Sequence, residues 1–132
     1  MEPFNYIDSA KHHFQYEFGN LYCYDHYAVS IINDGITVGT KVAKTLLNDL
    51  HNYFTSQPFV YIANRVFSHQ IDLSVYKLIN PKKLIGIAVV SISEQEIERA
   101  VEEQSLYNGS FGLFKNVDSA IAWANTFHKI AS

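Results

Sequence analysis

Two polar residues follow directly on a run of apolar ones: Asn64-Arg65 comes after Phe59–Ala63. A short apolar run rich in β-branched and aromatic residues predicts a buried strand, and ligands of open α/β sheets bind just beyond the carboxyl ends of such strands. The Arg65 guanidinium could bind a carboxylate or phosphate through two hydrogen bonds, with Asn64 fixing the ligand's orientation. The alternative is structural: Asn64 bonds to the loop backbone, and Arg65 pairs with Asp72.

The loop that follows carries the groups of an acid–base pair. His69 and Asp72 lie close together in it, and a histidine oriented by a carboxylate is the start of general acid–base catalysis. Ser68 and Ser74 are the nearby hydroxyls, but neither lies in a Gly-x-Ser-x-Gly nucleophile elbow. A surface loop with a helix cap accounts for the same residues. We therefore expect no catalytic residue here and no enzymatic activity.

The histidines lack the spacing of a metal site. None forms a His-x-x-x-His pair or a Glu-x-x-His motif, and the single cysteine, Cys23, cannot form a cysteine zinc cluster. The glycines form neither a Gly-x-x-x-x-Gly-Lys-Ser/Thr loop nor a Gly-x-Gly-x-x-Gly fingerprint. We therefore expect neither a bound metal nor a cofactor. The histidines are His12, His13, His26, His51, His69 and His128.

Composition indicates one folded domain over residues 1–132, with residues 1–12 as a loosely ordered N-terminal extension. Hydrophobic residues make up 48% and charged residues 17%, which provides for a sizeable core. The net charge of −3 leaves no basic stripe for nucleic acid, so none is expected as a partner. A lone cysteine, no signal-peptide pattern and no long apolar run predict a cytoplasmic protein without a transmembrane segment.

The spacing of apolar residues changes along the chain from the alternation typical of strands to the helical period of about 3.6. Strands are expected as a hairpin over His13–Tyr24 with its turn at Gly19-Asn20, and over Tyr27–Ile32, Phe59–Ala63, Leu84–Ile92 and Phe111–Lys115. Helices are expected over Thr40–Thr55 with Thr37 or Thr40 as its cap, over Ser74–Leu78, after the capping-box pair Ser93 and Glu96, and after Asn116. This order predicts an α/β fold whose mixed sheet combines an N-terminal antiparallel meander with parallel strands, covered by amphipathic helices.

Two residue clusters each have two interpretations. The acidic cluster is either a solvated helix face or an acidic docking surface for a basic partner; it comprises Glu94, Glu96, Glu98, Glu102 and Glu103. The tyrosines of the first quarter either pack against the helices or form a homodimer or partner surface; they are Tyr6, Tyr16, Tyr22, Tyr24 and Tyr27.

The order of these elements resembles the STAS-like proteins of the SpoIIAA-like group, small bacterial single-domain relatives of the anti-sigma-factor antagonists. The resemblance spans roughly residues 14–128. It rests on a glycine after the meander, a strand that ends in Asn-Arg, an aspartate before a short helix and then a tyrosine, a later apolar strand, and a final Phe, Ala and Trp. In this chain these are Gly35, Asn64-Arg65, Asp72, Tyr76, Gly86–Ser91, Phe114, Ala120 and Trp123.

The resemblance implies a binding module rather than a catalyst. Some STAS domains bind anti-sigma kinases and are switched by phosphorylation of a serine after a central strand, and others bind nucleotides, lipids or apolar ligands. This chain has Asn64-Arg65 where the antagonists have an Asp-Ser-Ser-Gly-like turn, so a phosphoserine switch is not expected; Ser68 and Ser74 are the nearby serines.

We accordingly expect a non-enzymatic module whose loop from Asn64 to Tyr76 contacts a protein partner or a small ligand. The alternative is a carrier or sensor of a small apolar or anionic ligand, and a third hypothesis is an enzyme that uses Arg65, His69 and Asp72. The candidate binding residues are Asn64, Arg65, Ser68, His69, Asp72 and Tyr76.

Overall fold

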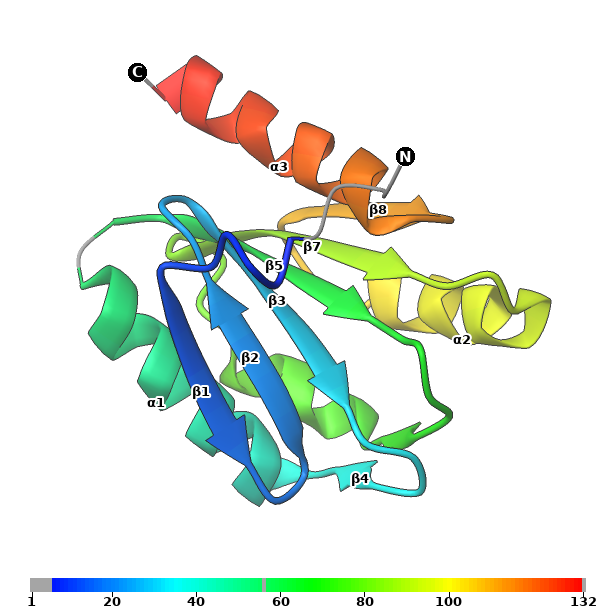
Figure 1. Ribbon diagram of the computed structural model, residues 1–132. Helices are drawn as coiled ribbons and strands as arrows, with labels where there is room; N and C mark the ends of the chain where they lie inside the picture. The colour runs from blue at the N-terminus through cyan, green and yellow to red at the C-terminus, as the bar shows by residue number, and fades with distance from the viewer. Residues whose placement is uncertain (1–5, 56, 132) are drawn as a thin grey trace.

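The computed structural model describes residues 6–55 and 57–131, which form a mixed sheet in the order β1-β2-β3-β5-β7-β8 (Figure 1). The strands are β1 (His12–Tyr16), β2 (Gly19–Cys23), β3 (Tyr27–Ile32), β5 (Phe59–Asn64), β7 (Leu84–Val90) and β8 (Ser110–Phe114). The first three strands pair antiparallel, and β3, β5, β7 and β8 run parallel. The predicted α/β fold, with a meander followed by parallel strands, is confirmed.

The parallel strands are joined by helical crossovers, because parallel neighbours cannot be linked by a tight turn. The helical segments are α1 (Thr40–Phe54), the 3₁₀ helix η1 (Leu73–Leu78), α2 (Glu94–Gln104) and α3 (Val117–Ala131). α1, η1 and α2 pack on one face of the sheet, and α3 covers the other (Figure 1). Along β5, Phe59 and Tyr61 join the first layer, whereas Val60 and Ile62 join the second. Burial on both faces explains why this strand is a continuous apolar run.

The hairpin turn lies earlier than predicted. Tyr16 pairs with Gly19, so Glu17 and Phe18 form the turn and Gly19 begins β2. Glycine is required at position 19 because a Cβ there would lie 2.3 Å from the carbonyl oxygen of Ile31. Its φ of +152° is also one that side chains rarely adopt. The predicted turn at Gly19-Asn20 is therefore wrong, since close approach of β3 rather than turn geometry calls for the glycine.

The helix caps agree with the sequence prediction at two of three starts. The Ser93 hydroxyl accepts a hydrogen bond from the Glu96 amide at 3.4 Å, and the Asn116 side chain accepts one from the Ser119 amide at 2.8 Å. The predicted threonine cap of α1 is wrong. Gly39 occupies that position without a side-chain hydrogen bond, because Thr40 is already helical.

The segment between β5 and β7 is more regular than the predicted loop. It contains β6 (Gln70–Ile71), which pairs in parallel with β4 (Thr37–Val38). Strands of this length carry no periodic signal in a sequence. The pairing anchors the middle of the segment beside the start of α1, and η1 follows it directly.

The meander tyrosines make internal contacts. Tyr16 donates to Asp49 of α1 at 2.5 Å, and Tyr24 donates to the Tyr6 carbonyl and stacks on Tyr27 at 4.6 Å between ring centroids. These contacts correspond to the packing interpretation, and a homodimer surface stays a prediction. Of the predicted N-terminal extension, residues 1–5 lie outside the described residues, whereas the Lys11 amide bonds to β2 at 2.8 Å. Within the described residues, no helix is long and apolar enough to cross a membrane.

Candidate functional site

A cavity of about 80 Å³ lies between the sheet and the layer formed by α1 and η1. Its walls are mainly apolar, with Leu46 and Leu50 from α1, Val75 from η1 and Ile32 and Ile87 from the sheet. Polar side chains gather where β5 ends, at the predicted ligand-binding edge of the sheet. The polar residues that line the cavity are Ser30, Tyr61, Asn64, Arg65, His69 and Tyr76.

Arg65 turns into the protein and binds Glu103 of α2. Its two terminal nitrogens donate to the two carboxylate oxygens at 2.6 and 2.5 Å, and the side chains are 4% and 0% exposed. Burial alone would lower the pKa of Arg65, but the hydrogen bonds and charge of Glu103 outweigh it and hold that pKa above its ordinary value. Arg65 therefore stays charged, and its partner is Glu103 rather than the expected Asp72.

Further side chains complete the network around this ion pair. The Tyr76 hydroxyl donates to Glu103 at 2.7 Å, and burial together with that carboxylate raises the pKa of Tyr76 well above its usual range. Glu96 lies 3.7 Å from Arg65 and accepts a hydrogen bond from Arg99 at 2.8 Å. Arg99 also donates to the His69 carbonyl at 3.0 Å. The network thus ties the segment after β5 to α2.

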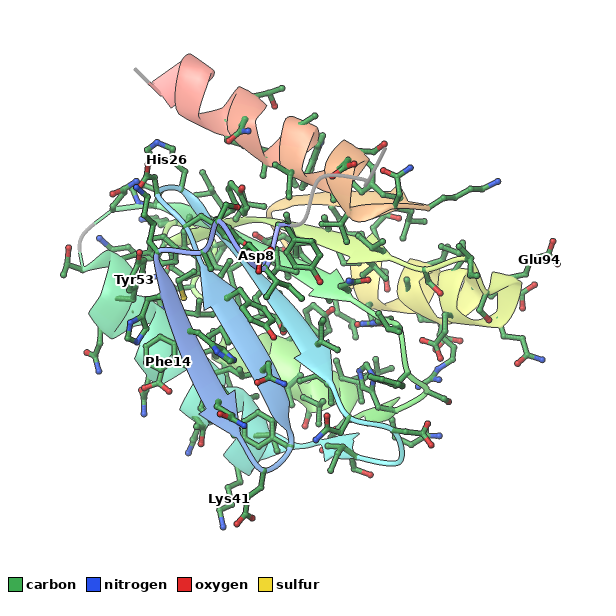
Figure 2. The ribbon with its side chains drawn as sticks, viewed as in Figure 1. Asp8, Phe14, His26, Lys41, Tyr53 and Glu94 are labelled. Carbon is green, nitrogen blue, oxygen red and sulfur yellow. The ribbon has the colours of Figure 1, made fainter. Side chains whose placement is uncertain are left out.

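The acidic cluster of α2 is divided between the surface and this network. Glu94 projects from the outer end of the helix (Figure 2), and Glu98 and Glu102 are exposed as well. Glu96 and Glu103 are buried, so the prediction of one solvated face is wrong for these two residues. The burial of these two acids could have been predicted from helical spacing, because Glu96 and Glu103 lie on the same helix face as the fully buried Ala100.

The structure separates the six candidate residues into two groups. Arg65, His69, Tyr76 and Asn64 line the cavity, and the Asn64 amide donates to the Tyr6 hydroxyl at 3.0 Å.

The other two, Ser68 and Asp72, are exposed and do not line the cavity. The Asp72 carboxylate instead caps η1, accepting from the Ser74 amide at 3.0 Å and the Ser74 hydroxyl at 2.8 Å. These hydrogen bonds lower the pKa of Asp72. The structure therefore does not bring Asp72 to the cavity where Arg65 and His69 lie.

Two buried nitrogens of residues that line the cavity have no hydrogen-bond partner in the part of the chain that the structure describes. They are Nε of Arg65 and Nδ1 of His69, in residues that are 8% and 7% exposed. Burial lowers the pKa of His69, and the positive charge of Arg65 lowers it further, so the imidazole is neutral at pH 7. The cavity therefore combines apolar walls with a neutral histidine and a free guanidinium N–H.

Within residues 6–55 and 57–131, no group of three or more His, Cys, Asp or Glu side chains is arranged to hold a metal ion. Comparisons with protein-family models, with curated proteins and with solved structures find no match to this chain. The class that fold and site define is accordingly a small α/β protein with a mixed sheet and a partly open, mainly apolar cavity between the sheet and α1.

Proposed function

We propose that this chain is a non-enzymatic STAS-like binding module that carries or senses a small, largely apolar molecule. The observation that carries the proposal is the cavity of about 80 Å³ under the carboxyl end of β5, walled by α1, η1 and the sheet. Well-packed domains leave few voids larger than a water molecule, so a cavity at the ligand-binding edge of an α/β sheet favours a bound ligand.

The inward orientation of the predicted binding residues supports a small ligand over a large one. Arg65 and Tyr76 both bond to Glu103, so neither side chain is free to contact a protein at the surface. The cavity is about half as large as an apolar cavity of about 150 Å³ that binds benzene. A compact ligand, or a short branch of a longer one, matches this volume.

The STAS-like assignment rests on the arrangement of the elements. An antiparallel meander, a helix and a central strand ending in Asn64-Arg65 are what that resemblance implies, and the mixed sheet agrees with it. A cytoplasmic setting is part of the proposal, supported by a single buried cysteine, Cys23, which a reducing compartment suits.

The test is native mass spectrometry of freshly purified protein together with methyl NMR of Leu46, Val75 and Ile87 during titration with small hydrophobic compounds. Ala43→Leu fills the cavity from α1, and Ala122→Leu adds the same side chain on the exposed side of α3. We expect a co-purified molecule or ligand-induced methyl shifts that Ala43→Leu abolishes and Ala122→Leu retains. Absence of both signals in the wild-type protein would exclude this function.

A protein partner is the second candidate, and exposed apolar side chains favour it. Val66 and Phe67 follow β5 and are 61% and 45% exposed, and Ile92 follows the neighbouring β7 and is 89% exposed. Asn64 of β5 pairs with Val90 of β7, so the exposed side chains that follow these two strands lie at the same edge of the sheet, beyond the carboxyl ends of the strands.

For this candidate we expect concentration-dependent self-association, or cross-linking to a partner through a photoreactive residue at position 67. Ile92→Asp should abolish either signal, and Val101→Asp on α2 should leave it intact. A strictly monomeric chain that forms no cross-link would rule the candidate out.

A further inference from the structure

Arg65 and His69, which line the cavity, each have a buried nitrogen without a hydrogen bond of normal geometry within residues 6–55 and 57–131, although the Phe67 backbone lies near the His69 ring. Arg65 Nε and His69 Nδ1 are both buried and both belong to residues that line the cavity. Buried polar atoms in native proteins nearly always have a partner, because an unmade hydrogen bond leaves the cost of removing the group from water uncompensated. An acceptor oxygen placed beside these nitrogens would offset that cost.

The charges around the cavity are already balanced. Arg65 is paired with Glu103, and Glu96 lies between Arg65 and Arg99, so two guanidinium groups face two carboxylates. His69 is neutral and contributes no positive charge. A carboxylate or phosphate in the cavity would therefore bring a charge without a counter-ion into apolar surroundings, which is unfavourable.

The two nitrogens define what the missing partner must offer. Nε of an arginine can only donate, so the ligand must present an acceptor. Nδ1 of a neutral histidine donates in one tautomer and accepts in the other, so it can bond a carbonyl or a hydroxyl. The remaining walls are aliphatic, with Leu46, Leu50, Val75 and Ile87 among them.

We propose that the cavity selects an uncharged, compact molecule with an apolar body and one carbonyl or hydroxyl oxygen, held by Arg65 Nε–H and His69. The inference rests on the proposed function and specifies the chemical class of its ligand. It replaces the anion-binding role expected for Arg65, because the two terminal nitrogens already bind Glu103 and the charge of Arg65 is balanced by that carboxylate.

Three probes of the same shape test the class: isobutyramide is neutral and polar, isobutyrate is its anionic counterpart, and 2,3-dimethylbutane is the hydrocarbon counterpart. Titrations are followed by NMR through the methyl groups of the cavity and the Nε–H resonance of Arg65. We expect isobutyramide to bind at least about tenfold more tightly than either counterpart and to shift the Arg65 Nε–H resonance.

A variant at His69 separates the contribution of the hydrogen bonds to binding from the contribution of the apolar walls. His69→Phe keeps a ring of similar size but removes Nδ1, so the preference for isobutyramide over 2,3-dimethylbutane should shrink by about tenfold while the hydrocarbon still binds. A circular dichroism spectrum and a urea titration establish that the variant is folded.

The outcomes distinguish this inference from the function on which it rests. Equal binding of the amide and the hydrocarbon, with an unmoved Arg65 resonance, would overturn the inference and leave an apolar ligand-binding module. Tightest binding of isobutyrate would overturn it in favour of an anion site. If no probe shifts the cavity methyl resonances or the Arg65 Nε–H resonance, the inference fails together with the proposed function.

Discussion

Arg65, the residue after β5, and Glu103, in the last turns of α2, form a bidentate ion pair at 2.6 and 2.5 Å although 38 positions separate them. Both side chains are buried, so each is the counter-ion on which the other depends. The pair also limits what Arg65 offers to a ligand, because its two terminal nitrogens donate to Glu103 and Nε is the nitrogen without a partner among the described residues.

The first prediction concerns this pair. Glu103→Gln leaves a buried guanidinium without its main counter-ion, and we expect the free energy of unfolding to fall by about 3 kcal/mol or more. Urea denaturation measures it. The control replaces the whole cluster by apolar groups, as Arg65→Met, Glu103→Met and Tyr76→Phe, and should recover most of the loss. A triple variant less stable than Glu103→Gln would contradict the argument.

The second prediction compares two buried tyrosines. Tyr76 donates to the Glu103 carboxylate, whereas Tyr107 donates to the Leu84 carbonyl, and the two residues are 8% and 7% exposed. Hydrogen bonds to charged groups contribute more than those between neutral groups. We expect Tyr76→Phe to cost about 1.5–3 kcal/mol of unfolding free energy and Tyr107→Phe about 0.5–1.5 kcal/mol. Equal losses in denaturant titrations would count against a charged acceptor at Tyr76.

The third prediction uses two glycines in different surroundings. A Cβ at Gly19 would lie 2.3 Å from the Ile31 carbonyl oxygen, whereas a Cβ at Gly39 would have nothing within 4 Å. We expect Gly19→Ala to lower the free energy of unfolding by about 3 kcal/mol, because backbone atoms of β3 must move. Gly39→Ala, at the start of α1, should cost less than about 1 kcal/mol. Thermal unfolding of both variants measures the two losses. A Gly19→Ala variant as stable as the wild-type protein would contradict the close approach of β3 to Gly19.

The layout of the fold could be predicted from the sequence because its signals are local. The run Phe59–Ala63 is apolar at every position because β5 is buried on both faces, and Ser93 and Asn116 mark the starts of α2 and α3. β4 and β6 could not be predicted, since two-residue strands have no period and depend on each other for pairing.

Only one half of the candidate site could be predicted from the sequence: the position of Arg65, but not its partner on α2. The position of Arg65 at the end of a buried strand marks the right edge, but its partner lies on a helix whose acids suggest a solvated face. The spacing of Glu96, Ala100 and Glu103 indicates that both acids face inward with the alanine, without indicating which base they meet. The cavity itself depends on packing between α1, η1 and the sheet, which no local pattern encodes.

The last prediction is the effect of pH through His69. Burial and the charge of Arg65 lower the folded-state pKa of this histidine below its ordinary 6.5, with Glu96 and the Phe67 backbone opposing and Arg99 adding to the shift. The unfolded chain therefore takes up a proton as pH falls through 6.5 while the folded protein does not. Stability that is fully present above that pH is then lost as pH falls, by at most about 1.4 kcal/mol per pH unit for one proton.

His69→Asn removes the titrating group, so its free energy of unfolding in urea should depend less on pH in this range than that of the wild-type protein. His13→Gln, which changes an exposed histidine on β1 away from the cavity, is the matched control. If His69→Asn retained the full slope, the acid sensitivity would belong to other groups. The imidazole would then not be the neutral side chain on which the selectivity of the cavity depends.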